Sequence, residues 1–375
     1  MIRHSSTSNS DPDAKSADLR RFLRKLLLVV PVVFFVAGVN VYVDPGGVFH
    51  RGQEKQIAKY LLEGDNVANV YNHDDRQGLR YYVEGLKEKK DVRVFGSSRT
   101  MVVDSEFFPG ERLFNASVTA GTLRDVVVNY ELFHEKGLVP RKVVIGIEPY
   151  MLNGAFDNKL YLEDAYRRAL ARLGLPVVES TPFWSRVVDR RYAQLLAPAY
   201  FQVSVRNLDK VIALGRPQPC PTKEFEVDTQ MARADGSLNY GKARRTRDAA
   251  EIRRKAERFT LRNPEELANF RVLDLNLRRM FETFASSLLE EGVEVIFLMA
   301  PYHPITYRMM LDNQAFRCVG EAKDYFEAYA AQHHIPVYGS YDAGACGVAE
   351  NDFYDAVHLS RQALLRVFRA GPRNT

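Results

Sequence analysis

An uncharged run of 18 residues, Leu26–Val43, lies near the N-terminus of the 375-residue chain. A helix that rises ~1.5 Å per residue covers about 27 Å over such a run, close to the roughly 30 Å hydrocarbon thickness of a bilayer. Four basic residues within Arg20–Lys25 directly precede it. The positive-inside rule then holds the N-terminal tail in the cytoplasm. We therefore expect a single-pass protein of the inner (cytoplasmic) membrane, with its body in the periplasm or another extracytoplasmic space.

Two other interpretations of this run stay open, a cleaved signal peptide and a buried core helix. A signal peptide has an apolar region of roughly 7–15 residues followed by a small-residue cleavage site. The longer run here, which ends in Asn40–Gly47, favours an uncleaved anchor. Residues 1–25 then form a polar cytoplasmic tail, 26–43 the transmembrane anchor and 44–375 the extracytoplasmic domain. A mean hydropathy of −0.28 excludes a polytopic membrane protein and allows one span.

Short apolar strands alternate with helices along the body of the chain. Strands are expected at 92–95, 112–116, 142–147, 293–298 and 335–338, and helices at 56–62, 77–87, 122–136, 264–292, 322–333 and 361–370. Such alternation is typical of a parallel sheet covered on both faces. We predict an α/β fold: a three-layer α/β/α sandwich around a five-stranded, mostly parallel sheet.

The segment from about 152 to 263 breaks this alternation. It shows helical patterns and no clear strand, so we expect a helical insertion there. Within 242–262, nine basic residues stand against three acidic ones. Such a run most often forms a solvated helix face; the alternative is contact with an anionic glycan, lipid headgroups or a protein partner. We do not expect nucleic acid as a partner, because the body lies outside and carries no recognised motif.

Polar residues follow the predicted strands at their carboxyl ends. Gly96-Ser97-Ser98-Arg99 follows the first strand, and Asp355 and His358 come after the fifth. Ligands bind beyond the carboxyl ends of the strands in such a sheet, so these residues are expected to meet at one edge. Asp355 and His358 are three positions apart and can face the same way. The carboxylate can then fix the imidazole tautomer while the imidazole takes a proton from a serine hydroxyl.

These short blocks resemble those of the SGNH/GDSL hydrolases. Gly96-Ser97-Ser98 is similar to the first block of that family, Gly121 falls near the glycine of the second, and Asp355-x-x-His358 matches the last. The layout also resembles the bacterial membrane-anchored branch, the DltD- and AlgX-type proteins of envelope polysaccharide acyl transfer. The resemblance covers about residues 40–375 and implies an SGNH/flavodoxin-like fold.

The resemblance also implies roles for single residues. Ser98 is the nucleophile, His358 the general base and Asp355 its orienter. The backbone N–H groups of Ser98 and Gly121 form part of an oxyanion hole. Arg99, also in the first block, is a candidate for substrate binding.

The chain departs from the family pattern at two positions. Ser97 stands where the first block usually has Asp, and Glu148 stands where the third block supplies an Asn donor. An ionised carboxylate cannot donate to an oxyanion. Asn115 or Asn153 takes over this role, or oxyanion stabilisation is weak, or the protein is not an enzyme.

Further residues near the strand ends are candidates for substrate binding. They are Glu148 after the third strand and Tyr302 and His303 after the fourth. For Tyr302 and His303, packing within the loop is the alternative. Clusters of Cys and His with metal-ligand spacing are absent from the sequence, and we expect no metal and no cofactor.

The predicted function is that of a serine esterase or O-acyltransferase acting on an envelope or extracellular polysaccharide. A membrane-bound acyltransferase or glycosyltransferase is the protein partner that this role implies. The alternative is a non-catalytic SGNH-fold scaffold or glycan-binding component of a cell-envelope assembly. Glu148 favours the alternative, whereas the set of Ser98, Asp355 and His358 favours the enzyme.

The three cysteines are Cys220, Cys318 and Cys346. An extracytoplasmic body exposes them to an oxidising compartment. Cys318 precedes the helix before the fifth strand, and Cys346 lies in the loop after that strand. We therefore predict a disulfide between Cys318 and Cys346 and a free thiol at Cys220.

Overall fold

The computed structural model describes residues 12–47, 49, 52–71, 73–157, 162–177 and 194–373. The chain divides into two compact units. The smaller unit combines residues 1–51 with 180–217, and the larger one combines 52–179 with 218–375. The predicted 152–263 insertion is thus shared between the two units.

The larger unit is built on a five-stranded parallel sheet. Its strands, in spatial order, are β3 (Leu113–Asn115), β2 (Val92–Phe95), β4 (Lys142–Gly146), β8 (Glu294–Met299) and β9 (Val337–Gly339). All neighbouring pairs run parallel, which confirms the five predicted strands and the sheet type. The chain places β3 on one side of β2 and all later strands on the other. The strand order therefore reverses between β2 and β4.

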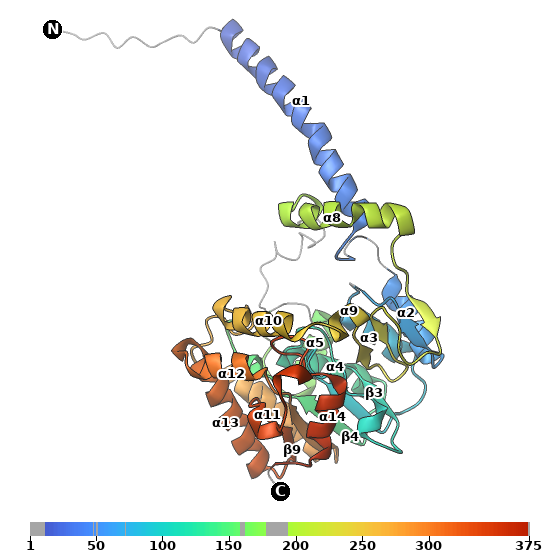
Figure 1. Cartoon of the computed structure of the whole chain (residues 1–375), viewed down its shortest axis with the longest axis vertical. Helices are drawn as coiled ribbons and strands as arrows, with labels where there is room; N and C mark the ends of the chain where they lie inside the picture. Colours follow the sequence, from blue (N-terminus) through green and yellow to red (C-terminus); the bar gives the residue numbers. More distant parts are fainter. Residues whose placement is uncertain are drawn as a thin grey trace, which may run out of the picture. The chain divides into compact units, whose positions relative to one another are not determined.

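Helices flank this sheet (Figure 1), and the strands contribute side chains to an apolar core on each face. Phe95 and Val143 belong to one core, whereas their neighbours Val94 and Val144 belong to the other. The strands are therefore buried on both faces, as the apolar run of β4 after Lys142 predicts for that strand. The helices of this unit are α2 (Gln53–Leu62), α3 (Asp75–Gly85), α4 (Leu123–Glu135), α5 (Glu163–Arg172), α9 (Lys242–Arg245), α10 (Ala249–Leu261), α11 (Leu275–Glu290), α12 (Pro304–Leu311), α13 (Arg317–Gln332) and α14 (Arg361–Arg369).

The first residues of α4 and α11 show where local sequence signals predict a helix start correctly and where they do not. α4 begins where predicted, because Thr122 and Asp125 form a capping box at its N-terminus. The predicted start of α11 at Pro264 is wrong. The Asp274 side chain instead accepts hydrogen bonds from the N–H groups of Asn276 and Leu277, so the helix begins after it.

A second, antiparallel sheet of four short strands belongs to the same unit. Its order is β5 (Cys220–Thr222), β1 (Asn66–Ala68), β6 (Met231–Ala232) and β7 (Leu238–Asn239). Three of these strands lie inside the segment predicted to be a helical insertion. That segment does contain α5, α8, α9 and α10, but the expectation of no strand there is wrong. Strands of two or three residues are too short to show a readable alternation of apolar and polar positions.

The predicted disulfide is not formed, since all three cysteines are free thiols. The buried Cys318 belongs to the apolar core on one face of the parallel sheet, and Cys346 packs against the core on the opposite face. The sheet separates the two sulfur atoms. Their positions before and after β9 in the sequence gave no information about the face of the sheet on which each lies.

The smaller unit contains α1 (Pro12–Val43) and α8 (Pro198–Leu214). α1 includes the whole predicted anchor and begins within the predicted tail. No helix in the described part of the chain is long and apolar enough to cross a membrane. The side chains of Leu26 and Leu28, inside the predicted anchor, lie outside that part. The anchor remains a prediction.

Candidate active site

Three of the residues singled out in the sequence meet at the carboxyl edge of the parallel sheet. Ser98 follows β2, and Asp355 and His358 lie between β9 and α14. Ser98 Oγ is 2.9 Å from His358 Nε2, and His358 Nδ1 is 2.8 Å from Asp355 Oδ1. The tautomer that satisfies both contacts carries its proton on Nδ1 and accepts the serine hydroxyl at Nε2. This arrangement can move a proton from the serine to the imidazole.

Burial and neighbouring charges together favour the protonation states that proton transfer from Ser98 to His358 needs. Burial lowers the pKa of His358 below its ordinary value, and the Asp355 carboxylate offsets part of that effect. Burial works against ionisation of Asp355, but His358 and Arg244 beside it hold the pKa of that carboxyl well below its usual range. Near neutral pH, Asp355 is therefore ionised and His358 is neutral, as a general base must be.

The turn that carries Ser98 leaves no room for a side chain at Gly96 or at Gly121. A Cβ atom on Gly96 would lie 2.5 Å from Thr100 Oγ1, and a Cβ atom on Gly121 would lie 2.3 Å from the carbonyl oxygen of Gly96. Thr100 closes the turn by donating its N–H to the carbonyl of Ser97 at 3.1 Å. Gly121 is therefore required by the close approach of two backbone segments.

Glu148 and Arg99, which were candidates for substrate binding, are buried behind the serine turn, with exposed fractions of 1% and 5%. Glu148 accepts from Ser97 Oγ at 2.7 Å and pairs with Arg99 Nη1 at 2.5 Å. Arg99 also donates to the backbone carbonyls of Val357 and Ala300. These contacts tie the turn after β2 to the loop that carries His358. The geometry thus favours a structural role for the pair over contact with substrate.

Tyr302 and His303 are also inside the protein. The Arg99 guanidinium stacks 3.9 Å from the centre of the Tyr302 ring. His303 is fully buried, accepts the N–H of Ile305 at the start of α12 and packs edge-on against Phe353. The geometry favours loop packing, the alternative interpretation, for both residues.

The predicted side-chain and glycine donors of the oxyanion hole have other partners. The Nδ2 group of Asn115 donates to the carbonyls of Thr100 and Val103, both at 2.8 Å. The N–H of Gly121 donates to the carbonyl of Val118 at 3.1 Å. Neither group is left to stabilise an oxyanion in this geometry.

The other asparagine considered for this role is engaged as well. Asn153 Nδ2 donates to the carbonyls of Glu266 and Ala268. By contrast, the backbone N–H of Ser98 has no hydrogen-bond partner in the described part of the chain. It is the one predicted donor that stays open to a developing negative charge.

Tyr240 and Arg244, which sequence reasoning did not assign to the site, contact it directly, and Arg247 lies 3.7 Å from Asp355 Oδ2. Tyr240 donates its hydroxyl to the Ser98 carbonyl at 3.0 Å and lies edge-on against the His358 ring, with centroids 5.8 Å apart. Arg244 donates to Asp355 Oδ2 at 2.7 Å and stacks 3.9 Å from the centre of the Tyr240 ring. Arg244 belongs to the basic run, so the interpretation of that run as a solvated helix face is wrong at this position.

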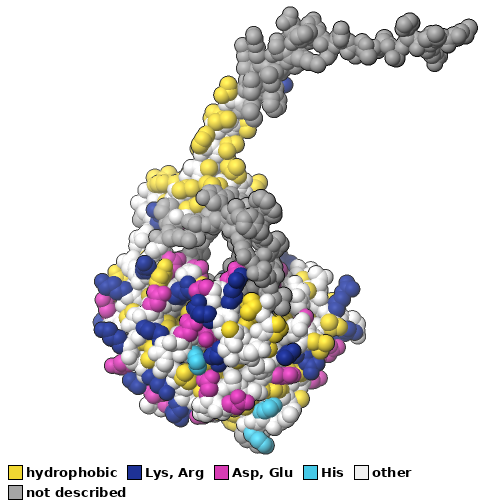
Figure 2. All heavy atoms as spheres, turned by 180° about the vertical axis from the view of Figure 1, so that it is seen from behind, with side chains coloured by type: hydrophobic (Ala, Val, Ile, Leu, Met, Phe, Trp, Pro, Cys, Tyr) yellow, Lys and Arg dark blue, Asp and Glu magenta, His cyan; other side chains and the backbone are white. Residues whose placement is uncertain are grey.

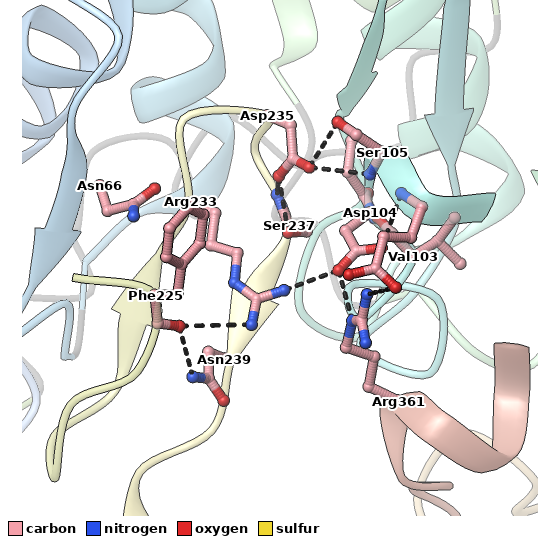
Figure 3. Close-up of polar contacts among 12 residues, drawn as sticks. Asn66, Val103, Asp104, Ser105, Phe225, Arg233, Asp235, Ser237, Asn239 and Arg361 are labelled. Carbon is pink, nitrogen blue, oxygen red and sulfur yellow. Dashed lines mark hydrogen bonds and ion pairs between the residues drawn. The ribbon is translucent and has the colours of Figure 1, made fainter. Parts of the chain in front are cut away.

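β6 and β7 form a hairpin just before Tyr240 and Arg244 in the sequence. Two carboxylates fix this hairpin to the main body (Figure 3). Asp104 Oδ2 accepts from Arg233 in the hairpin at 2.6 Å and also from Arg361 Nε at the start of α14. Asp235 in the hairpin turn accepts from the N–H and the hydroxyl of Ser105, at 2.9 and 2.8 Å. The small sheet thus positions the segment after β7, which carries Tyr240 and Arg244, at the carboxyl edge of the large sheet.

Comparisons with protein families and with curated proteins found no match for this chain. No protein-family model matches the sequence, and no curated protein matches it. Within the described residues, no group of three or more His, Cys, Asp or Glu side chains is arranged to hold a metal ion. Conclusions about function therefore rest on the geometry of the site and on the short sequence blocks that form it.

Proposed function

We propose that this protein is a serine-dependent esterase or O-acyltransferase. The observation that carries the proposal is the chain of contacts from Ser98 to His358 and Asp355, at 2.9 and 2.8 Å. His358 takes the hydroxyl proton as Ser98 Oγ attacks an acyl carbon, and returns it to the leaving alcohol. A sugar hydroxyl or a water molecule then attacks the acyl-serine ester and passes its proton to His358, which gives it to the departing Ser98 Oγ and so restores the serine.

The strand order supports an SGNH/flavodoxin-like fold for the larger unit. Numbered along the chain, the five parallel strands follow the order 2-1-3-4-5, a common doubly wound arrangement with helices in two outer layers. Ligands of such sheets bind at the point where the strand order reverses. Ser98 follows β2, which borders that point.

The substrate class follows from the resemblance of the short blocks to membrane-anchored SGNH proteins. We propose an acyl ester on an envelope or extracellular polysaccharide, handled outside the cytoplasmic membrane. A membrane-bound acyltransferase or glycosyltransferase is the partner proposed to act in the same process. α1 provides the proposed anchor.

A non-catalytic scaffold or glycan-binding component is the second candidate. This second candidate is favoured because few hydrogen-bond donors are free to stabilise an oxyanion at the site. Glu148 occupies the position of the usual Asn, and the amides of Asn115 and Asn153 are engaged elsewhere. With the N–H of Ser98 as the open donor, turnover depends on one backbone dipole or on a group that the substrate itself brings.

Covalent labelling of the full-length protein with a fluorophosphonate probe separates the two candidates. Ser98→Ala should abolish labelling, and the remote control Ser287→Ala, on α11, should label like the parent protein. Unchanged labelling of Ser98→Ala would overturn the assignment of the nucleophile. A parent protein that is folded and takes no label would favour the scaffold.

A further inference from the structure

In the smaller unit, α8 lies across the C-terminal end of α1 (Figure 1). Asn40 Nδ2 of α1 donates to the carbonyl of Leu195 at 2.9 Å, just before α8. Tyr200 of α8 donates its hydroxyl to Asp44 Oδ1, just after α1, at 2.7 Å. Polar contacts therefore fix the crossing of the two helices.

α8 has two different faces. Phe201, Val205, Leu208 and Ile212 recur at helical spacing and form an apolar stripe, of which Val205 and Ile212 are 48% and 64% exposed. Gln202, Arg206 and Asp209 recur at the same spacing about a quarter-turn further round the helix and are exposed. A soluble helix normally turns such a stripe toward a core. The crossing with α1 covers only part of this one.

The exposed apolar surface continues onto α1. Figure 2 shows hydrophobic side chains gathered along the described part of this helix. Val32, Val33, Phe34 and Phe35 are consecutive and all exposed, by 37–73%. Four consecutive residues point to every side of a helix, so the apolar surface surrounds α1. A protein partner covers one face of a helix, whereas lipid covers all of them. Lipid is therefore the occupant that fits this surface.

We propose that α8 lies in the interface of a lipid membrane, parallel to the membrane plane. The apolar stripe with Val205 and Ile212 then enters the acyl-chain boundary, and Arg206 and Lys210 reach the headgroups. The inference rests on the proposed anchoring by α1. It adds a second membrane contact at the end of the anchor, made by a segment more than 150 residues later in the chain.

Single labelling sites on α8 test this placement in the full-length protein. A Cys220→Ser, Cys346→Ser background retains only the buried Cys318. Val205→Cys or Ile212→Cys carries an environment-sensitive fluorophore, and Gln202→Cys and Asp209→Cys are matched controls on the polar face. The protein is reconstituted into phosphatidylethanolamine–phosphatidylglycerol vesicles. We expect blue-shifted emission at positions 205 and 212 and strong quenching there by lipids with a nitroxide on the acyl chain, with water-like emission at 202 and 209.

The outcomes distinguish this inference from the anchoring on which it rests. Protein that floats with the vesicles but shows equal, water-like emission at all four positions keeps the anchor and overturns the placement of α8. Blue-shifted emission at 205 and 212 without quenching by lipid nitroxides assigns the stripe to a protein partner or a second copy, and also overturns it. Protein that does not float with vesicles overturns both.

Discussion

Ser97 and Ser98 are neighbours in sequence, yet their hydroxyl groups face two opposite environments. Ser98 Oγ is partly exposed and meets His358, behind which Asp355 pairs with Arg244. Ser97 Oγ is buried and meets Glu148, which pairs with Arg99. Each side thus combines a serine, a carboxylate and an arginine.

The difference between the two sides is the imidazole. On the Ser98 side a neutral histidine stands between hydroxyl and carboxylate and can accept a proton near neutral pH. On the Ser97 side the Arg99 guanidinium has a raised pKa in spite of its burial, because Glu148 lies beside it, so it stays protonated and accepts nothing. One side is suited to proton transfer, and the other holds the backbone in place.

The largest expected effect is on the reactive side. Ser98→Ala and His358→Ala should each lower ester turnover by roughly 10³-fold or more, because each removes a group that forms or breaks bonds in the reaction. Both variants change a partly exposed polar group, so their thermal unfolding should match that of the parent protein. Hydrolysis of a chromogenic acyl ester, measured beside a melting curve, checks both statements. A folded His358→Ala with parental turnover would contradict the role of the imidazole.

The buried side should respond in stability. Arg99→Met removes one partner of a buried ion pair and leaves the Glu148 carboxylate uncompensated, at a cost of roughly 3–5 kcal/mol in the free energy of unfolding. Denaturant unfolding measures this loss. Arg80→Met, which breaks a pair with Asp164 on the surface, is the matched control and should cost at most about 1 kcal/mol. Equal losses would show that the Arg99–Glu148 pair does not hold the turn.

Arg244 should act on the pH profile. Its charge helps to keep the pKa of His358 low, so removing it raises that pKa. Activity requires the neutral imidazole and is lost as the pH falls through the pKa of His358. The acid limb of kcat/KM should therefore lie below about pH 6.5 in the parent protein and move to higher pH in Arg244→Met. Arg244→Lys keeps the positive charge, so its acid limb should stay close to that of the parent protein. An acid limb that does not move in Arg244→Met would assign Arg244 a purely structural role.

The sequence was informative where one segment alone determines the structure. The strands of the parallel sheet are short and mostly apolar, and such runs are buried wherever they pair, although Arg93 interrupts the run of β2. Asp355 and His358 were readable as a pair because they lie within one turn. The meeting with Ser98 followed from the rule that the carboxyl ends of parallel strands share an edge.

The sequence did not predict the side-chain contacts that join segments far apart in the chain. Arg244 and Asp355 are 111 positions apart, and nothing in the basic run marks Arg244 as the residue that reaches the site. The same holds for the asparagine amides: Asn115 is a plausible oxyanion donor by its position, but its partners are carbonyl groups 12 and 15 residues away that only the folded turn brings near. Hydrogen-bond partners of this kind depend on tertiary packing.

The smallest expected effect is that of Ser97→Ala, and it sharpens the comparison most directly. The substitution removes a donor to Glu148 and an acceptor for the N–H of Arg99. Glu148 keeps its pairing with Arg99, so we expect a loss of roughly 1–3 kcal/mol in unfolding free energy. Turnover per folded molecule should stay within a few fold of the parent value, because Ser98 and His358 keep their contact. Stability and turnover are measured on the same sample, beside Ser98→Ala. A stable Ser97→Ala without turnover would move the reactive hydroxyl to Ser97 and reverse the assignment of the two sides.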